Sequence, residues 1–275
     1  MKRKILRGLQ VSEFIHLDEL RNKRRALNNS AVQNALAQAE QWCQMAVDPL
    51  TQGTFVQIHE SNSPVLNQIS REVCKILDVE KIPDIYICHL MNVSIFPIGT
   101  DSGESYLIVP DYILRYNDED MLYYNFGNAV TMIKADHVGL STLASYMPGG
   151  SIFVDVPKLL FTAYLHSADS TSDRGGLLAC QSLAAAARCQ FFDLGIPPSQ
   201  SKKFFTTDAE AETFIENYLV AHKKTMENYS SIMTQAARFV QRMVYLEAPP
   251  NKMLSELFEW YKAPEGYHAV MSKSR

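Results

Sequence analysis

Apolar residues recur every three to four positions over much of the chain, a period that is typical of amphipathic helices. Ser63 and Pro64 open one such run, because Ser caps helices well and Pro is tolerated at the first helical position. The pair Gly175-Gly176 predicts a kink within another run. We expect helices over residues 31–45, 64–77, 117–137, 158–192, 208–244 and 251–262.

Short stretches of alternating or β-branched residues lie between these helices and predict strands. The turn Gly99-Thr-Asp-Ser-Gly103 separates two of them, which favours one small antiparallel sheet. The expected class is therefore α+β, mostly helical. The segments concerned are Thr54–His59, Ile85–Leu90, Asn92–Pro97 and Ser105–Val109.

Pro197-Pro198 ends the long helical block that follows the sheet. We therefore expect residues 1–196 to hold the N-terminal helices, the sheet and the candidate site. Residues 197–275 would form a helical C-terminal part packed on them, giving one compact domain. The aromatic and Met residues of that part have helical spacing, which indicates core packing or, alternatively, a contact surface. They are Phe204, Phe205, Phe214, Tyr218, Met226, Tyr229, Met233 and Phe239.

The composition is that of a globular protein, with 47% hydrophobic residues, and 26 Lys and Arg against 30 Asp and Glu give a formal charge of −4. This balance argues against a binder of nucleic-acid backbones. The most apolar stretch, residues 152–165, is interrupted by Asp155, Pro157 and Lys158, so we expect no membrane span. The basic start of the chain lacks the apolar segment of a signal peptide, and no CxxC pair occurs, which together favour a cytoplasmic protein.

Generic catalytic motifs are missing from the sequence. It has no glycine-rich phosphate loop and no GxSxG elbow, and no two histidines stand four residues apart. His166, Asp169 and Asp173 do share one helix face, and with a fourth group they form a candidate metal site. A solvated or salt-bridged face is the alternative interpretation of the same spacing.

The order of the elements and several short motifs resemble the HtpX-like and CAAX-prenyl-protease superfamily of gluzincin metallopeptidases, and in particular its soluble bacterial members. No single motif is specific; their order and spacing carry the resemblance. It implies a zincin-like fold with a zinc-binding helix over Phe126–Ile133. The similar segments are Lys2–Gln10, Ile82–Ile87, Met91-Asn92, Asn117–Asp120, Asp173–Ala179 and Pro249–Tyr267.

The chain departs from this family at the residues that do the chemistry. Asn128 and Met132 stand at the positions of the two zinc-binding histidines, and Ala129 stands at that of the general base. Asp169 falls on the third ligand, one methylene shorter than the family's Glu. Met suits Cu(I) rather than Zn(II), and Ala cannot accept a proton, so we expect neither bound zinc nor peptide hydrolysis.

Two further residues have expected supporting positions. Asp173 corresponds to a carboxylate that orients a zinc histidine. Because that histidine would be Met132 here, Asp173 is expected to pair with Arg174, with His137 or with backbone.

The sequence thus favours an inactive metallopeptidase homologue that acts by binding. Its partner would be a peptide added to a sheet edge, for which Asn92–Phe96 is the candidate strand, or an active paralogue. The alternative is a hydrolase with a relocated metal site around His137, His166, Asp169 and Asp173. A structural or assembly protein is the third possibility.

Overall fold

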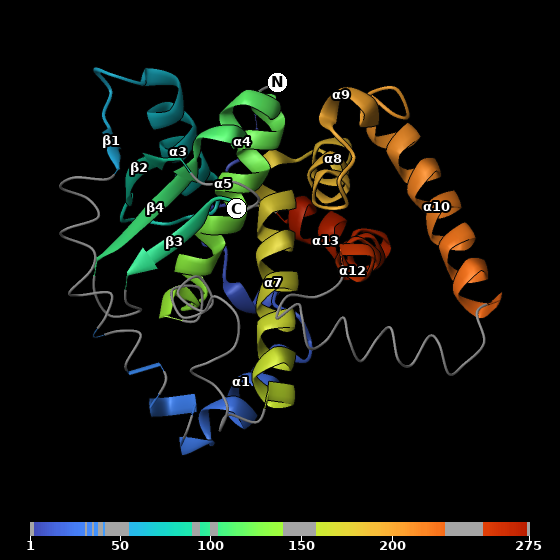
Figure 1. Cartoon of the computed structure of the whole chain (residues 1–275), viewed down its shortest axis with the longest axis horizontal. Helices are drawn as coiled ribbons and strands as arrows, with labels where there is room; N and C mark the ends of the chain where they lie inside the picture. Colours follow the sequence, from blue (N-terminus) through green and yellow to red (C-terminus); the bar gives the residue numbers. More distant parts are fainter. Residues whose placement is uncertain are drawn as a thin grey trace.

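The fold places a small sheet on one side of two central helices and a group of further helices on the other side (Figure 1). The structure is a computed structural model that describes residues 3–30, 32–34, 36–37, 41, 55–89, 94–99, 104–139, 158–228 and 250–273. The predicted helix over residues 31–45 falls mostly outside these ranges. None of the helices in the described ranges is both long and apolar enough to cross a bilayer.

The described elements confirm an α+β fold that is mostly helical. The strands are β1 (Val56–Ile58), β2 (Asp84–Cys88), β3 (Phe96–Gly99) and β4 (Ser105–Pro110). The N-terminal and central helices are a 3-10 turn, Val11–Glu13, then α1 (Glu19–Leu27), α3 (Pro64–Ile76), α4 (Asp111–Tyr116), α5 (Glu119–Lys134) and α7 (Lys158–Cys180). The later helices are α8 (Leu183–Asp193), α9 (Pro198–Ser201), α10 (Asp208–Asn228), α12 (Pro250–Lys262) and α13 (Tyr267–Ser272).

The sheet is mixed, so the prediction of an antiparallel sheet was wrong. Its strand order is β1-β2-β4-β3, with β2 and β4 parallel and the two outer pairs antiparallel. The parallel pair arises because β3 folds back on the far side of β4 rather than between β2 and β4. As a result β1 and β3 form the two edges.

The two central helices begin and continue differently from the prediction. The helix expected over residues 117–137 is α5, which begins at Glu119; Asp118 caps it, and its side chain accepts a hydrogen bond from the backbone N–H of Met121 at 3.0 Å. Helix α7 runs through Gly175-Gly176 as one helix and ends at Cys180. Gln181, with φ at 55°, turns the chain there, and Ser182 caps α8. The expected single helix over residues 158–192 is therefore two helices, and the break between them lies at Gln181, five residues after Gly176.

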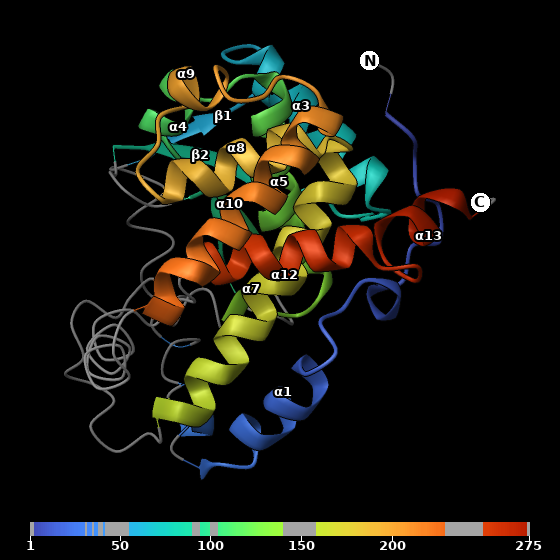
Figure 2. The same ribbon diagram turned by 90° about the vertical axis from the view of Figure 1, so that its right-hand side faces the viewer.

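The main core joins the sheet, the central helices and the C-terminal helices. Its buried side chains include Leu107 of β4, Phe126 of α5 and Leu257 of α12. Figure 2 shows α8, α10 and α12 on the side of α5 that faces away from the sheet. Residues on both sides of position 197 thus share one core. Within the predicted aromatic stripe, Phe205, Phe214 and Tyr218 pack around Phe191, which confirms core packing for this part of it.

The N-terminal segment crosses this core and meets the C-terminal helix. The backbone N–H of Leu6 donates to the carbonyl of Ile76 at 2.9 Å, and that of Gly8 donates to Asp78 at 2.9 Å. Closer to the N-terminus, the Lys4 ammonium donates to the carbonyl of Lys273 at 3.0 Å. The two ends of the described chain therefore lie side by side.

Candidate functional site

Helices α5 and α7 pack in close contact at the position where the resemblance places an active site. A Cβ added to Gly127 would lie 2.4 Å from the Cβ of Ala179, so glycine is needed for this approach. A Cβ added to Gly175 would lie 1.7 Å from Oγ1 of Thr131. Gly127 of α5 thus lies against Ala179 of α7, and Thr131, one turn later on α5, lies against Gly175, one turn earlier on α7. The two helices are therefore antiparallel.

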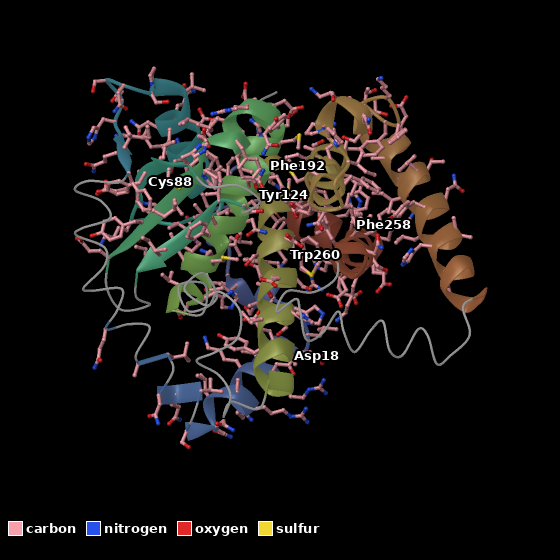
Figure 3. The ribbon with its side chains drawn as sticks, viewed as in Figure 1. Asp18, Cys88, Tyr124, Phe192, Phe258 and Trp260 are labelled. Carbon is pink, nitrogen blue, oxygen red and sulfur yellow. The ribbon has the colours of Figure 1, made fainter. Side chains whose placement is uncertain are left out.

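A buried polar cluster links α5, α7 and α8 beside this contact, and Tyr124 marks its place in the middle of the molecule (Figure 3). Oδ1 of Asp173 accepts hydrogen bonds from the Tyr124 hydroxyl and from Nδ2 of Asn128, both at 2.8 Å. The Gln190 amide in turn donates to the Tyr124 hydroxyl at 2.8 Å. Two side chains thus donate to the Asp173 carboxylate, and a third donates to one of these two.

Burial raises the pKa of Asp173 to about 7, because the charged form loses its hydration. The donors on Tyr124, Gln190 and Asn128 lower this pKa and limit the shift. Burial also raises the pKa of Tyr124 well above its usual range, so its hydroxyl keeps its proton. Near neutral pH this buried carboxyl group therefore exists in both its neutral and its charged form.

The structure corrects the expected surroundings of Asp173. It does not pair with Arg174 or His137, and the residue of α5 that it contacts is Asn128, not Met132. Arg174 instead donates to the carbonyls of Phe14 and Ile15, at 3.1 and 2.8 Å. Neighbouring residues on a helix point in directions about 100° apart, which is why Asp173 and Arg174 serve different interfaces.

The other positions of the family's zinc site lie along the same helix pair. Ala129 is completely buried, at 0% exposure, and Met132 is partly exposed. Met132 is one turn beyond Asn128, and Asp169 is one turn before Asp173 on the antiparallel helix. The helix repeat therefore places Met132 across from Asp169.

These side chains do not fit a zinc ion. The Asn128 amide is bonded to Asp173, and Ala129 offers no ligand atom. Met132 supplies a thioether, which prefers softer metals. Only Asp169 remains as a suitable ligand, whereas zinc sites in peptidases use three protein ligands. Within the described ranges no three His, Cys, Asp or Glu side chains are grouped so that they could hold a metal ion.

His137 belongs to a second buried cluster at the far end of α5. Its Nε2 lies 2.7 Å from Oε1 of Glu19, and the two side chains are 1% and 2% exposed. Thr171 of α7 donates to the other oxygen of Glu19 and accepts from the backbone N–H of His16, the latter at 2.9 Å. This cluster attaches the N-terminal segment to both central helices.

The relocated metal site is not assembled by these contacts. His137 is bound to Glu19, and Asp173 is bound to Tyr124 and Asn128. His166 and Asp169 are partly buried on α7. Asn92, the expected start of a groove strand, lies outside the described residues, but Phe96 begins the edge strand β3.

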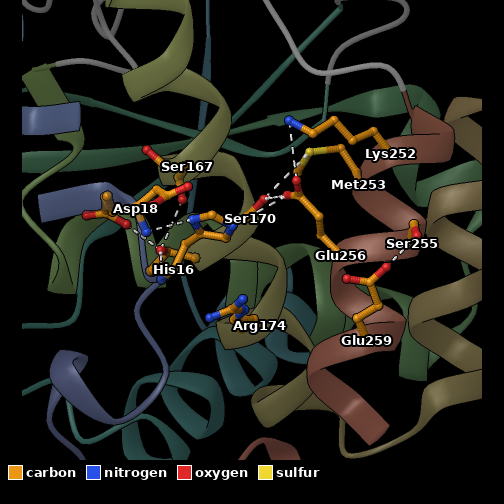
Figure 4. A network of polar contacts seen from close by, with 12 residues as sticks. His16, Asp18, Ser167, Ser170, Arg174, Lys252, Met253, Ser255, Glu256 and Glu259 are labelled. Atoms are coloured by element: carbon orange, nitrogen blue, oxygen red, sulfur yellow. Dashed lines mark hydrogen bonds and ion pairs between the residues drawn. The ribbon is translucent and has the colours of Figure 1, made fainter. Parts of the chain in front are cut away.

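A third polar cluster joins the N-terminal segment, α7 and α12 (Figure 4). Ser170 donates to Glu256, whose carboxylate lies 3.8 Å from Nε2 of His16 and 3.3 Å from the Lys252 ammonium. Burial and the nearby Arg174 lower the pKa of His16. Sequence reasoning missed Glu19, Ser170 and Glu256, because the contacts of each join segments that are far apart in the sequence.

The chain was compared with profiles of known protein families, with curated proteins and with solved structures, and none of the three comparisons gave a match. The resemblance to gluzincin peptidases therefore rests on the residues quoted above.

Proposed function

We propose that this protein is a non-catalytic relative of the HtpX-like metallopeptidases and that it acts by binding another protein. The observation that carries the proposal is the hydrogen bond from Asn128 to Asp173 beside the completely buried Ala129. At these positions the side chains are used for contacts between two helices. A peptidase needs them to hold an ion and a water molecule in contact with substrate.

The absence of a proton acceptor at Ala129 supports the same proposal independently of any metal. General acid–base catalysis typically contributes ~10²–10⁴ in rate. A methyl group cannot supply it, and its complete burial keeps it out of reach of a substrate.

The edges of the sheet support a binding role, because an edge strand can accept an extended peptide as a further strand. Strand β3 is the edge in contact with α5, and three of its four residues are buried. Strand β1 is the other edge, where Val56 is 62% exposed. A partner at the β1 edge would not enter the α5–α7 contact. We do not propose the relocated hydrolase, since His137 and Asp173 have separate partners.

The test measures bound metal and proteolysis on the same purified full chain. We expect sub-stoichiometric zinc after dialysis against zinc buffer, and no cleavage of casein or of a fluorogenic peptide above the rate of a boiled sample. Stoichiometric zinc together with cleavage that a chelator abolishes would overturn the proposal. A variant with Asp169→Ala serves as the control, because any zinc-dependent cleavage by the family site would be lost in it.

A further inference from the structure

Helix α1 is attached to α7 by one face only. Glu19 bonds to His137 and Thr171, and Asn22 donates to the carbonyl of Ala163 at 3.1 Å. Ala26, two turns after Glu19 on the same face, is completely buried. These anchors fix the helix at the end of the molecule where α7 begins (Figures 1 and 2).

The opposite face of α1 combines exposed leucines with arginines. Leu17 and Leu20 are 92% and 64% exposed, although Leu side chains are among those most often buried. A spacing of 100° per residue places three exposed arginines on the same side of the helix. The surface consists of Leu17, which lies in the turn before α1, together with Leu20, Arg21, Arg24 and Arg25 of α1, and is called the α1 basic face below.

The charges on this face are only partly neutralised. Arg21 pairs with Asp18 at 2.8 Å. Arg24 and Arg25 have no acidic partner among the described residues, in a chain whose formal charge is −4. The molecule therefore carries a local positive patch although its net charge is negative. This charge distribution gives it a preferred orientation near an anionic surface.

We propose that the α1 basic face docks reversibly on an anionic lipid surface. Arginines attract acidic headgroups, and protruding leucines enter the boundary between headgroups and acyl chains. A lipid surface receives protruding side chains without a matching pocket, whereas an acidic protein partner would have to provide one. This inference goes beyond the proposed function and does not depend on it, because α1 takes no part in the α5–α7 contact at Asn128.

The test is co-sedimentation of the full chain with phosphatidylcholine vesicles that either contain or lack phosphatidylserine. We expect binding only to the anionic vesicles, and weaker binding as ionic strength rises from roughly 0.05 M to roughly 0.5 M. Arg24→Gln with Arg25→Gln should lower the partition coefficient about thirty-fold, since each basic residue near such a surface contributes about a factor of five. Leu17→Ser with Leu20→Ser should lower it about tenfold while the salt dependence persists.

A matched control separates the α1 basic face from overall charge. Lys203→Gln with Lys223→Gln removes two exposed cations from α9–α10 and should change binding less than about threefold. Equal losses in the two double variants would overturn the proposal, and so would absence of binding to anionic vesicles. Binding to soluble poly-glutamate as tight as to the vesicles would also overturn it, in favour of an acidic polypeptide. Thermal unfolding of each variant verifies that it is folded.

Discussion

Nδ2 of Asn128 donates a 2.8 Å hydrogen bond to Oδ1 of Asp173, and this bond joins α5 to α7 where the resemblance would place a zinc ligand. The same carboxyl group accepts from Tyr124 and lies in the buried interior. The side chain at position 128 therefore joins two packed helices and is hydrogen-bonded to a buried acid. The first two predictions concern this acid and the helix contact beside it.

Asp173 should make the stability of the protein depend on pH. Its pKa is about 7 in the folded protein against an ordinary value of 3.8, so the folded state holds the proton more tightly than the unfolded chain. This contribution is fully present below pH 3.8 and is lost as pH rises through about 7, amounting to about 4 kcal/mol in all. Urea unfolding of wild type and Asp173→Asn from about pH 5 to about pH 8 tests it.

We expect the free energy of unfolding of Asp173→Asn, relative to wild type, to rise with pH over that range. An Asn carbonyl at position 173 can still accept from Tyr124 and Asn128, so the variant should fold. Asp136→Asn, at an exposed residue after α5, is the matched control and should run parallel to wild type. Parallel curves for wild type and Asp173→Asn would show that the acid does not titrate in this range. The lowered pKa of His16 affects all three proteins alike.

The contact between Thr131 and Gly175 predicts a coupled pair of substitutions. In Gly175→Ala the new Cβ would lie 1.7 Å from Oγ1 and 2.6 Å from Cβ of Thr131, and rotation of the Thr131 side chain cannot move its Cβ away. Overpacking of this kind costs about 1–3 kcal/mol. Thr131→Gly removes the clash, at about 0.5 kcal/mol of helix propensity, because Thr is itself a weak helix former. Chemical denaturation should show that the double variant loses less stability than the two single variants lose together. A loss equal to that sum would contradict the contact.

The buried pair of Glu19 and His137 predicts a large loss of stability when one partner is removed. Glu19→Ala leaves His137 and Thr171 without their acceptor in the interior, for which the expected cost is about 1–3 kcal/mol for each unsatisfied donor. Guanidinium unfolding measures it. Lys81→Ala provides the comparison, because that side chain forms an exposed pair with Glu104 at 4.0 Å and its loss should change stability little. Similar stabilities of the two variants would argue against buried hydrogen bonds to Glu19.

The register of the central helices predicts that a metal site can be introduced. Asn128→His and Met132→His place two imidazoles one turn apart on α5, opposite Asp169, while Asp173 can accept the ring N–H of the first histidine. We expect the double variant to bind one zinc ion with micromolar or tighter affinity in a titration with a competing chelator. The two single variants are the controls and should bind at least about tenfold more weakly. Equal affinities would show that the helices do not have this register.

Local sequence chemistry predicted where the central helices begin but not where they end. Helix α5 begins at Glu119 and α7 at Lys158, against expected starts at 117 and 158, whereas the expected ends at 137 and 192 lie three and twelve residues too far along the chain. The glycine pair of α7, which was expected to kink a helix, lies inside one continuous helix. In the structure Gly175 admits Thr131 of another helix, a contact that the sequence around it does not reveal.

Contacts between distant segments could not be predicted in this way. The parallel pairing of β2 with β4 depends on where the chain returns after β3, which no strand pattern specifies. Glu19 and His137 are 118 positions apart, and Glu19 lies in a polar stretch that favours an exposed helix. The hydrogen bond between Asn128 and Asp173 was likewise not predicted, because the resemblance placed Asp173 next to Met132, one helical turn away from Asn128.

The bond between Lys4 and the carbonyl of Lys273 spans 269 positions. During synthesis by the ribosome, the first segment is exposed long before its last partner exists, so this closure must be among the latest events. Until then the Lys4 ammonium lacks this partner and remains in contact with solvent. Slow translation near residue 273 would prolong that interval without changing the final fold.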